Sequence, residues 1–368
     1  MNTLSLSEPM RRALEAMNFT TATPIQAQAI PLLLEGKDII GQAQTGTGKT
    51  GAFAIPVIER IQHKQHGVQA IVICPTRELT LQVAETFHQL TQFQPEILTL
   101  CVFGGQPIDK QIKNLKRNPQ IVVGTPGRMK DLIHRGNLKL GAVGTVVLDE
   151  ADEMLNMGFL PDIEWILGKT PQLRQTALFS ATMPFSILTL AKRFQKNAVQ
   201  VKVTLQDQPP VKIDQRYYEV DKAEKMSALK RLMSHHQFER LIIFCNTKWK
   251  VDGMVRKLQK AGFPAEGLHG GKTQNQRTRT MQNFRKGVLS ILVATDVAAR
   301  GLDVEQVEAV INYDLPKDTA FYTHRIGRTG RAGQSGLAFS LVDSEQLPLL
   351  DEILELVDSP LVRQELPA

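Results

Sequence analysis

Short runs of apolar residues alternate with longer segments of helical pattern along the whole chain. In the first half, runs rich in Val, Ile and Leu predict strands at residues 38–41, 70–75, 97–104, 120–126, 145–150 and 176–181. Each run ends just before a polar or glycine-containing loop. Strands of this kind, separated by helices, are typical of a parallel sheet with helices on both faces, and such sheets bind ligands at the carboxyl ends of their strands.

The same alternation starts again after the apolar run at residues 199–203. The polar segment that follows contains adjacent prolines, Pro209 and Pro210, and is predicted to be a linker between domains. Further strands are predicted at residues 215–220, 241–246, 290–296, 309–314 and 337–342. The halves share this alternation without a repeated sequence, so we expect two similar α/β domains, residues 1–204 and 213–368, joined by a linker at 205–212.

Composition supports two folded domains and a polyanionic partner. The 368 residues are 42% hydrophobic and 22% charged, which is ordinary for folded domains of about 150 to 200 residues each. The net charge of +7 favours association with a polyanion. No apolar run approaches the ~18 residues of a membrane span, the first ten residues show no signal pattern, and the three cysteines (Cys74, Cys101 and Cys245) lie in apolar runs. We therefore expect a reducing, cytoplasmic setting.

The segment AQTGTGKT, residues 43–50, lies between a predicted strand and a predicted helix. It fits the pattern of a phosphate-binding loop except that Ala43 stands at the first glycine position. Its glycines let backbone N–H groups face phosphate oxygens, Lys49 can reach the terminal phosphates, and Thr50 can ligate Mg²⁺. The alternative is a glycine-rich turn with an unrelated lysine, which the strand–loop–helix context disfavours.

The predicted strand TVVL is followed by acidic residues at 149, 150 and 152. Asp149 is placed to hold Mg²⁺, and Glu150 could accept a proton from an attacking water. Acidic residues after a strand are commonly no more than favourable charge at a helix N-terminus. Together with the candidate phosphate loop, however, they predict hydrolysis of a nucleoside triphosphate.

Two further segments leave alternatives open. Phe19 and Gln26, ahead of the phosphate loop, offer an aromatic face and an amide that could read an adenine edge, although an ordinary loop before an ordinary helix is the simpler interpretation. The segment HRIGRTGR, residues 324–331, places an arginine at every third position. Those arginines could form a solvated face, a phosphate-binding patch, or half of a nucleotide site completed by a distant part of the chain.

A series of motifs in fixed order shows that the chain resembles the DEAD-box ATP-dependent RNA helicases of superfamily 2. The residues that carry the resemblance are TPIQ (23–26), AQTGTGKT, PTRELT (75–80), GG (104–105), TPGR (125–128), DEAD (149–152), SAT (180–182), QNQR (274–277), ATDVAARGLD (294–303) and HRIGRTGR. The resemblance extends from about residue 17 to about residue 333. It implies two RecA-like domains in a monomeric minimal helicase core, with ATP and Mg²⁺ as cofactors and RNA as the partner.

The resemblance also implies roles in ATP hydrolysis. Phe19 would stack on adenine, Gln26 would hydrogen-bond it, and Arg328 and Arg331 would be arginine fingers that reach ATP when the domains close. The implied ATP-binding set is Phe19, Gln26, Gln44, Thr45, Gly46, Thr47, Gly48, Lys49, Thr50, Gly301, Asp303, Arg328 and Arg331. The implied catalytic set is Lys49, Asp149, Glu150, Arg328 and Arg331, with Mg²⁺ held by Thr50 and Asp149.

Further roles concern coupling and RNA. Ser180 and Thr182 would bond with Asp152 and relay the nucleotide state, and His324 and Arg325 would brace the closed interface. The implied RNA contacts are Pro75, Thr76, Arg77, Glu78, Gly104, Gly105, Thr125, Pro126, Gly127, Arg128, Asn246, Thr247, Gly270, Arg277 and Thr295. Hydroxyl, arginine and glycine backbone groups hold phosphates without reading bases, so we expect sequence-independent binding that weakens with salt.

The chain departs from the family's usual residues at a few positions, including Asn18 for a glycine and Thr80 for an alanine. It also ends soon after the second predicted domain, so we expect a minimal core or a shortened chain. Two rival functions stay open: a DNA helicase with the same core, and an ATP-dependent RNA clamp with little turnover. A nucleotide kinase or GTPase would leave the second α/β half unexplained.

Overall fold

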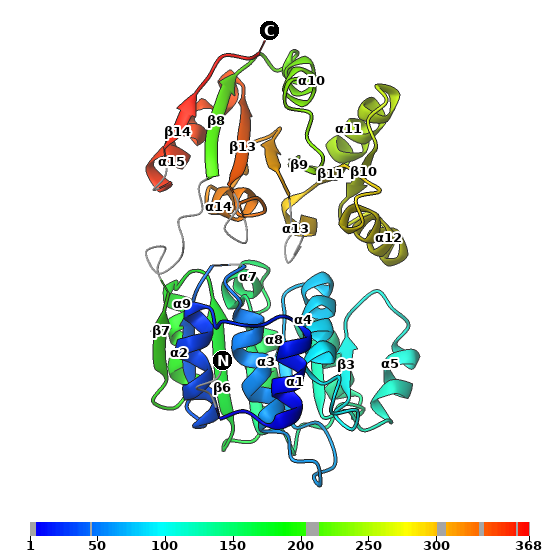
Figure 1. Cartoon of the computed structure of the whole chain (residues 1–368), viewed down its shortest axis with the longest axis vertical. Helices are drawn as coiled ribbons and strands as arrows, with labels where there is room; N and C mark the ends of the chain where they lie inside the picture. The colour runs from blue at the N-terminus through cyan, green and yellow to red at the C-terminus, as the bar shows by residue number, and fades with distance from the viewer. Residues whose placement is uncertain are drawn as a thin grey trace. The chain divides into compact units, whose positions relative to one another are not determined.

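Two parallel sheets of seven strands each, one in either half of the chain, form the framework of the computed structural model (Figure 1). The structure describes residues 5–44, 46–203, 213–299, 307–330, 335–357 and 360–367. The chain divides into two compact units between residues 208 and 209. The predicted linker at 205–212 lies outside the described residues. The predicted fold class, two RecA-like α/β domains, is confirmed by these sheets and by the solved structures compared below.

The first sheet has the strand order β3-β4-β2-β5-β6-β1-β7. Its strands are β1 (Ile39–Gln42), β2 (Ala70–Ile73), β3 (Thr99–Val102), β4 (Ile121–Gly124), β5 (Thr145–Leu148), β6 (Gln175–Ser180) and β7 (Val199–Lys202). Neighbouring strands are parallel, so all of their carboxyl ends meet at one edge. Successive side chains enter opposite faces: Val72 packs in one core, and Ile71 and Ile73 pack in the other.

The second sheet has the order β10-β11-β9-β12-β13-β8-β14. Its strands are β8 (Ile213–Glu219), β9 (Leu241–Phe244), β10 (Ala265–Leu268), β11 (Ile291–Ala294), β12 (Ala309–Asn312), β13 (Gly336–Val342) and β14 (Leu361–Arg363). Numbered from its own first strand, this order is identical to that of the first sheet. Topologically equivalent strand ends can therefore be compared between the units.

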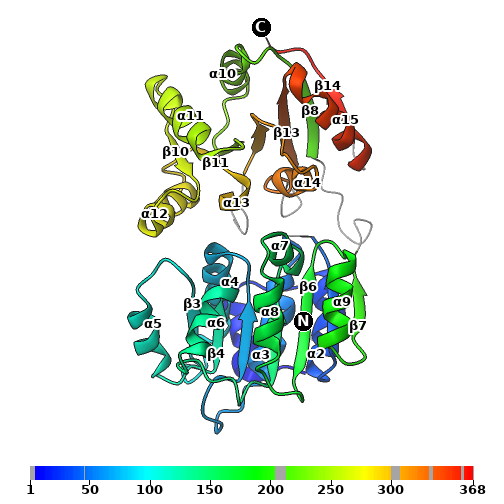
Figure 2. The same cartoon turned by 180° about the vertical axis from the view of Figure 1, so that it is seen from behind.

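Helices cover both faces of each sheet, and Figure 2 shows the side opposite to that of Figure 1. In the first unit one face carries α1 (Glu8–Ala16), α2 (Pro24–Leu34), α3 (Lys49–Glu59) and α4 (Arg77–Leu90). The other carries α5 (Ile108–Leu115), α6 (Pro126–His134), α7 (Ala151–Asn156), α8 (Leu160–Leu167) and α9 (Phe185–Phe194). In the second unit one face of the sheet carries α10 (Lys225–His236) and α11 (Lys248–Lys260). The other face carries α12 (Gln274–Arg285), α13 (Asp296–Ala299), α14 (Ala320–Ile326) and α15 (Leu347–Leu356).

Three strands were not among those predicted from the sequence: β7, which coincides with the apolar run at 199–203, and β10 and β14. β10 reads AEGL, and its Glu266 and Gly267 interrupt the apolar run by which a buried strand is recognised. The carboxylate of Glu266 accepts a hydrogen bond from the Thr280 hydroxyl of α12, so the side chain has a polar partner within the fold. β14 is a three-residue strand that pairs only with β8, at the edge of the sheet. Neither β10 nor β14 has the length or pattern that a sequence signal needs.

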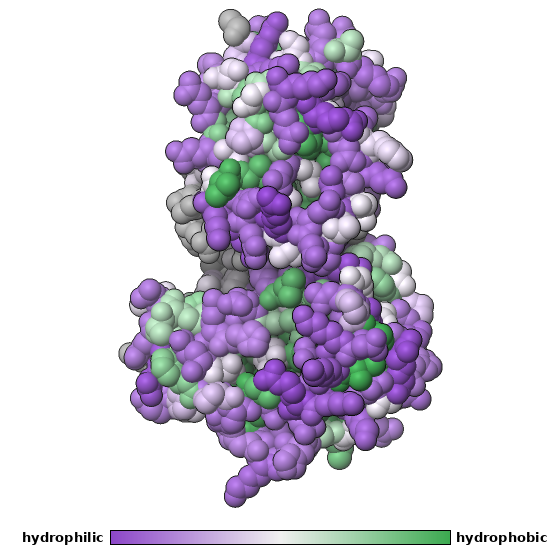
Figure 3. Space-filling view, turned by 90° about the vertical axis from the view of Figure 1, so that its right-hand side faces the viewer, coloured by the Kyte–Doolittle hydropathy of each residue, from purple (hydrophilic) through white to green (hydrophobic). Residues whose placement is uncertain are grey.

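The face of the molecule drawn in Figure 3 is mostly hydrophilic. On the face drawn in Figure 3, hydrophobic residues form small patches separated by hydrophilic side chains. Within the described residues, no helix combines the length and the apolar character that crossing a membrane requires.

Candidate functional site

The loop between β1 and α3 is held in shape by its glycines and by Lys49. Gly46 and Gly48 have φ angles of +84° and +89°, a left-handed conformation that favours glycine. Lys49, the first residue of α3, is buried, and its Nζ donates to the carbonyl oxygen of Ala43 over 2.9 Å. The Thr47 hydroxyl donates to the carbonyl oxygen of Gln44 over 2.8 Å. Of the residues predicted in this loop, only Thr45 lies outside the described part of the chain.

Gln26 connects the start of α2 to this phosphate loop. Its side chain is fully buried; Oε1 accepts from the backbone N–H of Thr23 over 3.0 Å, and Nε2 donates to the carbonyl oxygen of Gly48 over 3.0 Å. A Cβ atom added at Gly51 would lie 2.8 Å from Gln26 Nε2 and 3.7 Å from the ring of Phe19. The structure therefore brings the two predicted adenine-reading side chains together beside the first turn of α3.

Two family departures are accommodated by the local geometry. Asn18 has a φ angle of +55°, and asparagine adopts this left-handed conformation more readily than most residues other than glycine. Thr80, in α4, is fully buried, and its hydroxyl donates to the carbonyl oxygen of Thr76 over 2.8 Å. Neither residue leaves a strained or unpaired group where the usual glycine or alanine would stand.

The acidic loop after β5 holds a buried carboxylate close to Lys49. Asp149 Oδ1 accepts from the backbone N–H of Glu150 over 3.0 Å. Burial raises the pKa of Asp149 to about 7, while the positive charge of Lys49 acts in the opposite direction. Glu150 has φ +51° and ψ +53°, an uncommon conformation for a residue with a side chain and one that is concentrated at functional sites.

Asp152 is bonded to the loop that follows β6. Its Oδ2 accepts both the backbone N–H and the hydroxyl of Thr182, each over 2.8 Å. Its backbone N–H donates to the Ser180 hydroxyl over 3.2 Å, and that hydroxyl donates to the carbonyl oxygen of Thr182 over 2.7 Å. The structure thus contains the contact between Asp152 and the SAT segment that the resemblance implied.

Sheet topology explains why these segments meet. The phosphate loop, the acidic loop and the SAT loop follow β1, β5 and β6, which are neighbours in the order β5-β6-β1. Their carboxyl ends share one edge of the parallel sheet, which is where such sheets bind ligands. A phosphate-facing loop and a buried carboxylate at one edge suit a nucleotide with its divalent cation.

The donor set fits Mg²⁺ only when phosphate oxygens complete it. Within the residues that the structure describes, no cluster of three or more His, Cys, Asp or Glu side chains could hold a metal ion. Asp149 and Thr50 offer a carboxylate and a hydroxyl, which are hard oxygen donors of the kind that Mg²⁺ prefers. Mg²⁺ usually keeps several waters and binds through one or two carboxylates plus substrate phosphates, so two protein oxygens are sufficient.

The predicted RNA contacts of the first unit lie at the ends of β2, β3 and β4. Arg77 opens α4, and its guanidinium lies against the turn after β3: a Cβ atom added at Gly105 would be 2.1 Å from Arg77 Nη1. Both Nη atoms of Arg128 donate to the carbonyl oxygen of Gln106 over 3.2 Å. The strands adjoin in the order β3-β4-β2, so Pro75–Glu78, Gly104–Gly105 and Thr125–Arg128 share one edge.

The predicted RNA contacts of the second unit follow the equivalent strands. Asn246 and Thr247 come after β9, Gly270 after β10 and Thr295 after β11, in the order β10-β11-β9, and Arg277 lies in the first turn of α12. Thr247 caps α11 by accepting from the backbone N–H of Lys250 over 3.3 Å. Sequence reasoning did not reveal this equivalence, because β10 was not recognised.

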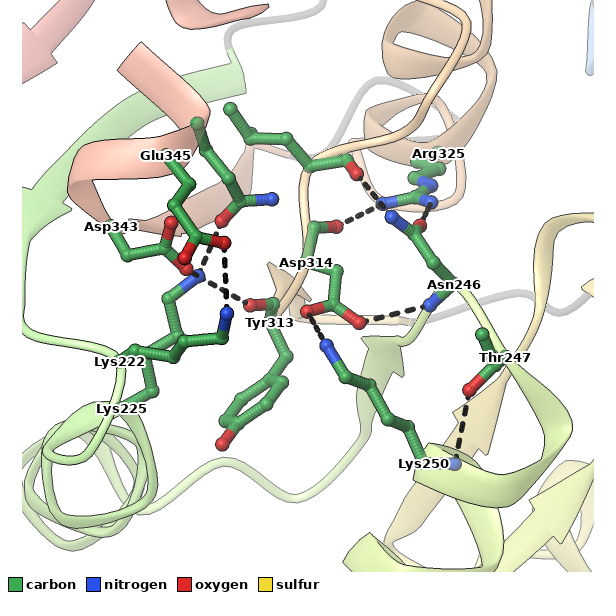
Figure 4. Close-up of polar contacts among 12 residues, drawn as sticks. Lys222, Lys225, Asn246, Thr247, Lys250, Tyr313, Asp314, Arg325, Asp343 and Glu345 are labelled. Carbon is green, nitrogen blue, oxygen red and sulfur yellow. Dashed lines mark hydrogen bonds and ion pairs between the residues drawn. The ribbon is translucent and has the colours of Figure 1, made fainter.

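Asn246 is bonded inside its own unit. Its Nδ2 donates to the carbonyl oxygen of Leu315 over 2.8 Å, its Oδ1 accepts from Arg325 over 3.0 Å, and its backbone N–H donates to Asp314 over 3.0 Å (Figure 4). Both ends of the side-chain amide therefore serve the fold. Any contact that Asn246 makes with RNA would have to share these groups.

Arg325 is fully buried and uses all five of its N–H groups within the second unit. Nε and Nη2 each donate one hydrogen bond to the carboxylate of Asp296, and Nη2 donates a second one to Asn246 Oδ1. Nη1 donates to Asn312 Oδ1 over 3.1 Å and to the carbonyl oxygen of Asp314 over 2.6 Å. That Arg325 braces the closed interface stays a prediction, and because its donors are already occupied within the second unit, such a role would act through these partners.

Arg328 and His324 lie beside this group. Arg328 Nε donates to the carbonyl oxygen of His324 over 3.0 Å, and both residues line a small recess with Arg325. The other residues predicted for the second unit's part of the nucleotide site, Gly301, Asp303 and Arg331, lie outside the described residues.

Two acidic residues of this region were missed. Asp296 is the carboxylate partner of Arg325, and Asp314 accepts from Lys250 Nζ over 2.7 Å as well as from Asn246. Each follows a buried strand by two residues, and an acidic residue just after a strand is the signal that singled out Asp149 in the first unit. Applied to β11 and β12, the same signal would have identified both.

Comparisons with known proteins agree with this geometry. A family model described as DEAD/DEAH box helicase matches residues 23–190, and a model described as helicase conserved C-terminal domain matches residues 224–333. The chain is 49% identical over 350 residues to the DEAD-box ATP-dependent RNA helicase CshA of Geobacillus kaustophilus, covering 95% of this chain and 75% of that protein. It is 47% identical over 363 residues to CshA of Bacillus subtilis, covering 99% and 73%.

A solved structure with the same architecture carries both kinds of ligand. Dbp5 of S. cerevisiae bound to RNA and ADP BeF3 matches with a TM-score of 0.90 and 33% sequence identity, covering 99% of this chain and 95% of that one.

Proposed function

The chain belongs to the DEAD-box family of ATP-dependent RNA helicases, and from this membership we propose that it binds RNA and ATP with both units, separates short duplexes locally, and hydrolyses ATP to release the RNA. Its enzymatic activity is RNA-stimulated conversion of ATP and water to ADP and phosphate.

One arrangement supports the proposal most strongly: a single edge of the first sheet carries both candidate sites. The strand ends β5-β6-β1 carry the nucleotide residues, and β3-β4-β2, directly beside β5, carry the RNA residues. Because β2 and β5 are neighbours, a change around ATP is transmitted to the RNA side through one hydrogen-bonded strand pair and its loops. The ring of bonds between Asp152 and Thr182 lies on the nucleotide side of this boundary.

The residues of the phosphate loop are proposed to bind and polarise ATP. Lys49 exchanges the carbonyl oxygen of Ala43, its partner over 2.9 Å, for the terminal phosphates. Glu150 accepts the proton of the attacking water. Thr50 and Asp149 would hold Mg²⁺, which when bound neutralises phosphate charge. Phe19 stacks on adenine and Gln26 hydrogen-bonds it, with the Gly48 contact keeping the amide in register with the phosphate loop.

The second unit is proposed to supply Arg328 and Arg331 as arginine fingers. Such residues stabilise charge on the transferred phosphoryl group and accelerate hydrolysis by about 10³-fold or more. The RNA track is also divided between equivalent strands of the two units. RNA bound to both units would therefore favour the state in which residues of both units act on ATP, which makes ATP turnover depend on RNA.

RNA is proposed to bind through its backbone. The candidate contacts are arginines, hydroxyls and glycine backbone at strand ends, which hold phosphates without reading sequence. The net charge of +7 agrees with a polyanionic ligand. Affinity should therefore fall steeply with salt.

The test compares RNA and DNA of the same sequence and length in a steady-state ATPase assay with a parallel duplex-unwinding assay. We expect RNA to stimulate multiple turnovers and unwinding, and DNA to stimulate neither. Equal stimulation by DNA would favour the DNA-helicase alternative. A burst of one ATP per protein without further turnover would favour the clamp.

We further propose that the protein acts as a monomer in the cytoplasm. All three cysteines are free, and burial raises the pKa values of Cys101 and Cys245 to about 12, which suppresses their thiolate forms. Light scattering and subcellular fractionation test the two statements.

A further inference from the structure

Trp249 is a large aromatic side chain that α11 does not use for packing. The helix buries Val251, Met254 and Leu258 against the sheet, whereas Trp249 is 75% exposed. The other tryptophan of the chain, Trp165, stacks on the ring of His134 with centroids 4.4 Å apart. Exposing an indole to water forgoes about 2 kcal/mol or more of burial free energy. Single exposed apolar side chains are common on protein surfaces, so the residues around Trp249, and not its exposure alone, point to a ligand.

The position of Trp249 places it beside the predicted RNA contacts of the second unit. It is the second residue of α11, two residues after Thr247 and three after Asn246, which follow the carboxyl end of β9. In an α-helix each Cα–Cβ bond tilts toward the N-terminus, so a side chain in the first turn is directed back toward that edge of the sheet.

The loop after β10 lies next to the same turns of α11. His269 Nε2 and Lys272 Nζ each lie 3.1 Å from Asp252 Oδ1. A Cβ atom added at Gly271 would be 3.8 Å from Cδ of Lys248. The candidate RNA residue Gly270 is therefore part of a loop that adjoins the start of α11.

Lysines flank Trp249 at the start of α11, and another lies on the adjoining loop. Lys248 Nζ lies 5.2 Å from the centroid of the Trp249 ring, and Lys250 and Lys272 follow on the same helix start and on the adjoining loop. Lys250 and Lys272 pair with Asp314 and Asp252, which keeps them in place. Aromatic faces combined with cations that track phosphates are the usual composition of single-strand binding sites.

We propose that Trp249 stacks on an unpaired base of the RNA strand whose phosphates are held at the ends of β9, β10 and β11. This rests on the proposed function, and it adds a base contact to a track that otherwise holds only backbone. Stacking on an indole tolerates any base, so the contact favours unpaired over paired RNA without selecting a sequence.

The emission of Trp249 tests the proposal directly, because the chain has only two tryptophans. Wild-type protein and Trp249→Phe are each titrated with a ten-nucleotide oligouridylate in the presence of ADP and beryllium fluoride. The difference between the two emissions reports Trp249, and we expect RNA to quench it. Replacing uridines one at a time by abasic residues should abolish the quenching at one position and leave it at the others.

Binding measured by fluorescence anisotropy provides a second measurement. Trp249→Ala should weaken oligouridylate binding about tenfold, as expected for loss of one stacked base, and Trp249→Phe should recover part of the loss. Val288→Ala is the matched control, because Val288 is 70% exposed and lies before β11, at the opposite end of the strands. It should bind as wild type does.

Unchanged Trp249 emission at saturating RNA, with Trp249→Ala binding as tightly as wild type, would overturn the inference and favour a protein ligand for the indole. Quenching that persists with every abasic substitution would overturn it as well, since it would show proximity without stacking. If RNA fails to stimulate ATP hydrolysis by the wild-type protein, the proposed function fails instead. The two failures are therefore distinct.

Discussion

Thr182 donates twice to one oxygen of Asp152, through its backbone N–H and through its hydroxyl, each over 2.8 Å. Ser180 closes the ring by accepting from the backbone of Asp152 and donating to the carbonyl oxygen of Thr182. Asp152 belongs to α7, directly after the acidic loop, and Thr182 follows β6. The ring therefore joins two loops of the candidate nucleotide site.

Thr182→Val removes the hydroxyl donor and keeps the backbone bond and the shape of the side chain. Losing one hydrogen bond to a carboxylate weakens the link between the loops. We expect the rate of duplex unwinding to fall about tenfold, a typical coupling effect, and RNA-stimulated ATP hydrolysis to change much less. Both rates are measured on the same preparation. Thr189→Val is the control, because that hydroxyl serves only the carbonyl of Phe185 in α9; equal losses of both activities in Thr182→Val would show that the ring acts on ATP itself.

Asp149 predicts a pH-dependent stability of the nucleotide-free protein. Burial raises its pKa to about 7, so between pH ~4 and pH ~7 the unfolded chain has lost a proton that the folded chain retains. Stability therefore falls as pH rises through this window. The asparagine of Asp149→Asn cannot ionise. The difference between the urea concentration at which this variant is half unfolded and that of wild type should therefore increase from pH 5 to pH 7 and then level off.

The unfolding of the first unit is followed by the emission of Trp165, in protein that carries Trp249→Phe in both forms compared. A difference between wild type and Asp149→Asn that stays constant from pH 5 to pH 8 would contradict the raised pKa. Adding ATP and Mg²⁺ should favour the ionised carboxylate and reduce the difference above pH 7.

The sequence was sufficient to predict the strands that are continuous apolar runs, such as β9 (LIIF) and β11 (ILVA), and the loops that follow them. It was not sufficient for β10, where Glu266 is hydrogen-bonded by a hydroxyl from α12 that only the tertiary structure brings near. The three arginines of HRIGRTGR look alike in sequence. α14 ends at Ile326, so Arg325 turns into the core while Arg328 follows the helix end, and regular spacing alone does not reveal that difference.

Gly105 predicts a specific loss of RNA affinity. Its φ angle is +79°, and an added Cβ atom would lie 2.1 Å from Nη1 of Arg77. Gly105→Ala must therefore displace the guanidinium, and we expect the RNA concentration for half-maximal ATPase stimulation to rise about tenfold, the effect of losing one charge-assisted bond to phosphate. The Kd for ATP, measured without RNA, should not change.

Gly136→Ala is the matched control for this substitution. Gly136 has a φ angle of +70°, so alanine meets a similar backbone strain there, but an added Cβ atom would have nothing within 4 Å. If Gly136→Ala lost RNA affinity as Gly105→Ala does, the effect would come from backbone strain and not from displacement of Arg77.

We expect substitution by alanine to have opposite effects at Arg325 and at Arg328. Arg325→Ala removes a fully buried guanidinium and leaves its acceptors, among them the partly buried carboxylate of Asp296, without their donor, which should lower the free energy of unfolding of the second unit by about 3 kcal/mol or more. Arg328→Ala removes a bond to one backbone carbonyl and should change stability by about 1 kcal/mol or less. Because Arg328 is a proposed arginine finger, however, Arg328→Ala should lower RNA-stimulated turnover of ATP about 10³-fold. Urea unfolding followed by Trp249 emission measures the effect on stability, and steady-state ATPase rates measure the effect on turnover.

Two outcomes would contradict these expectations. A stable but inactive Arg325→Ala would indicate a direct role for Arg325 in the reaction. An Arg328→Ala variant with normal turnover would return HRIGRTGR to the interpretation as a basic patch.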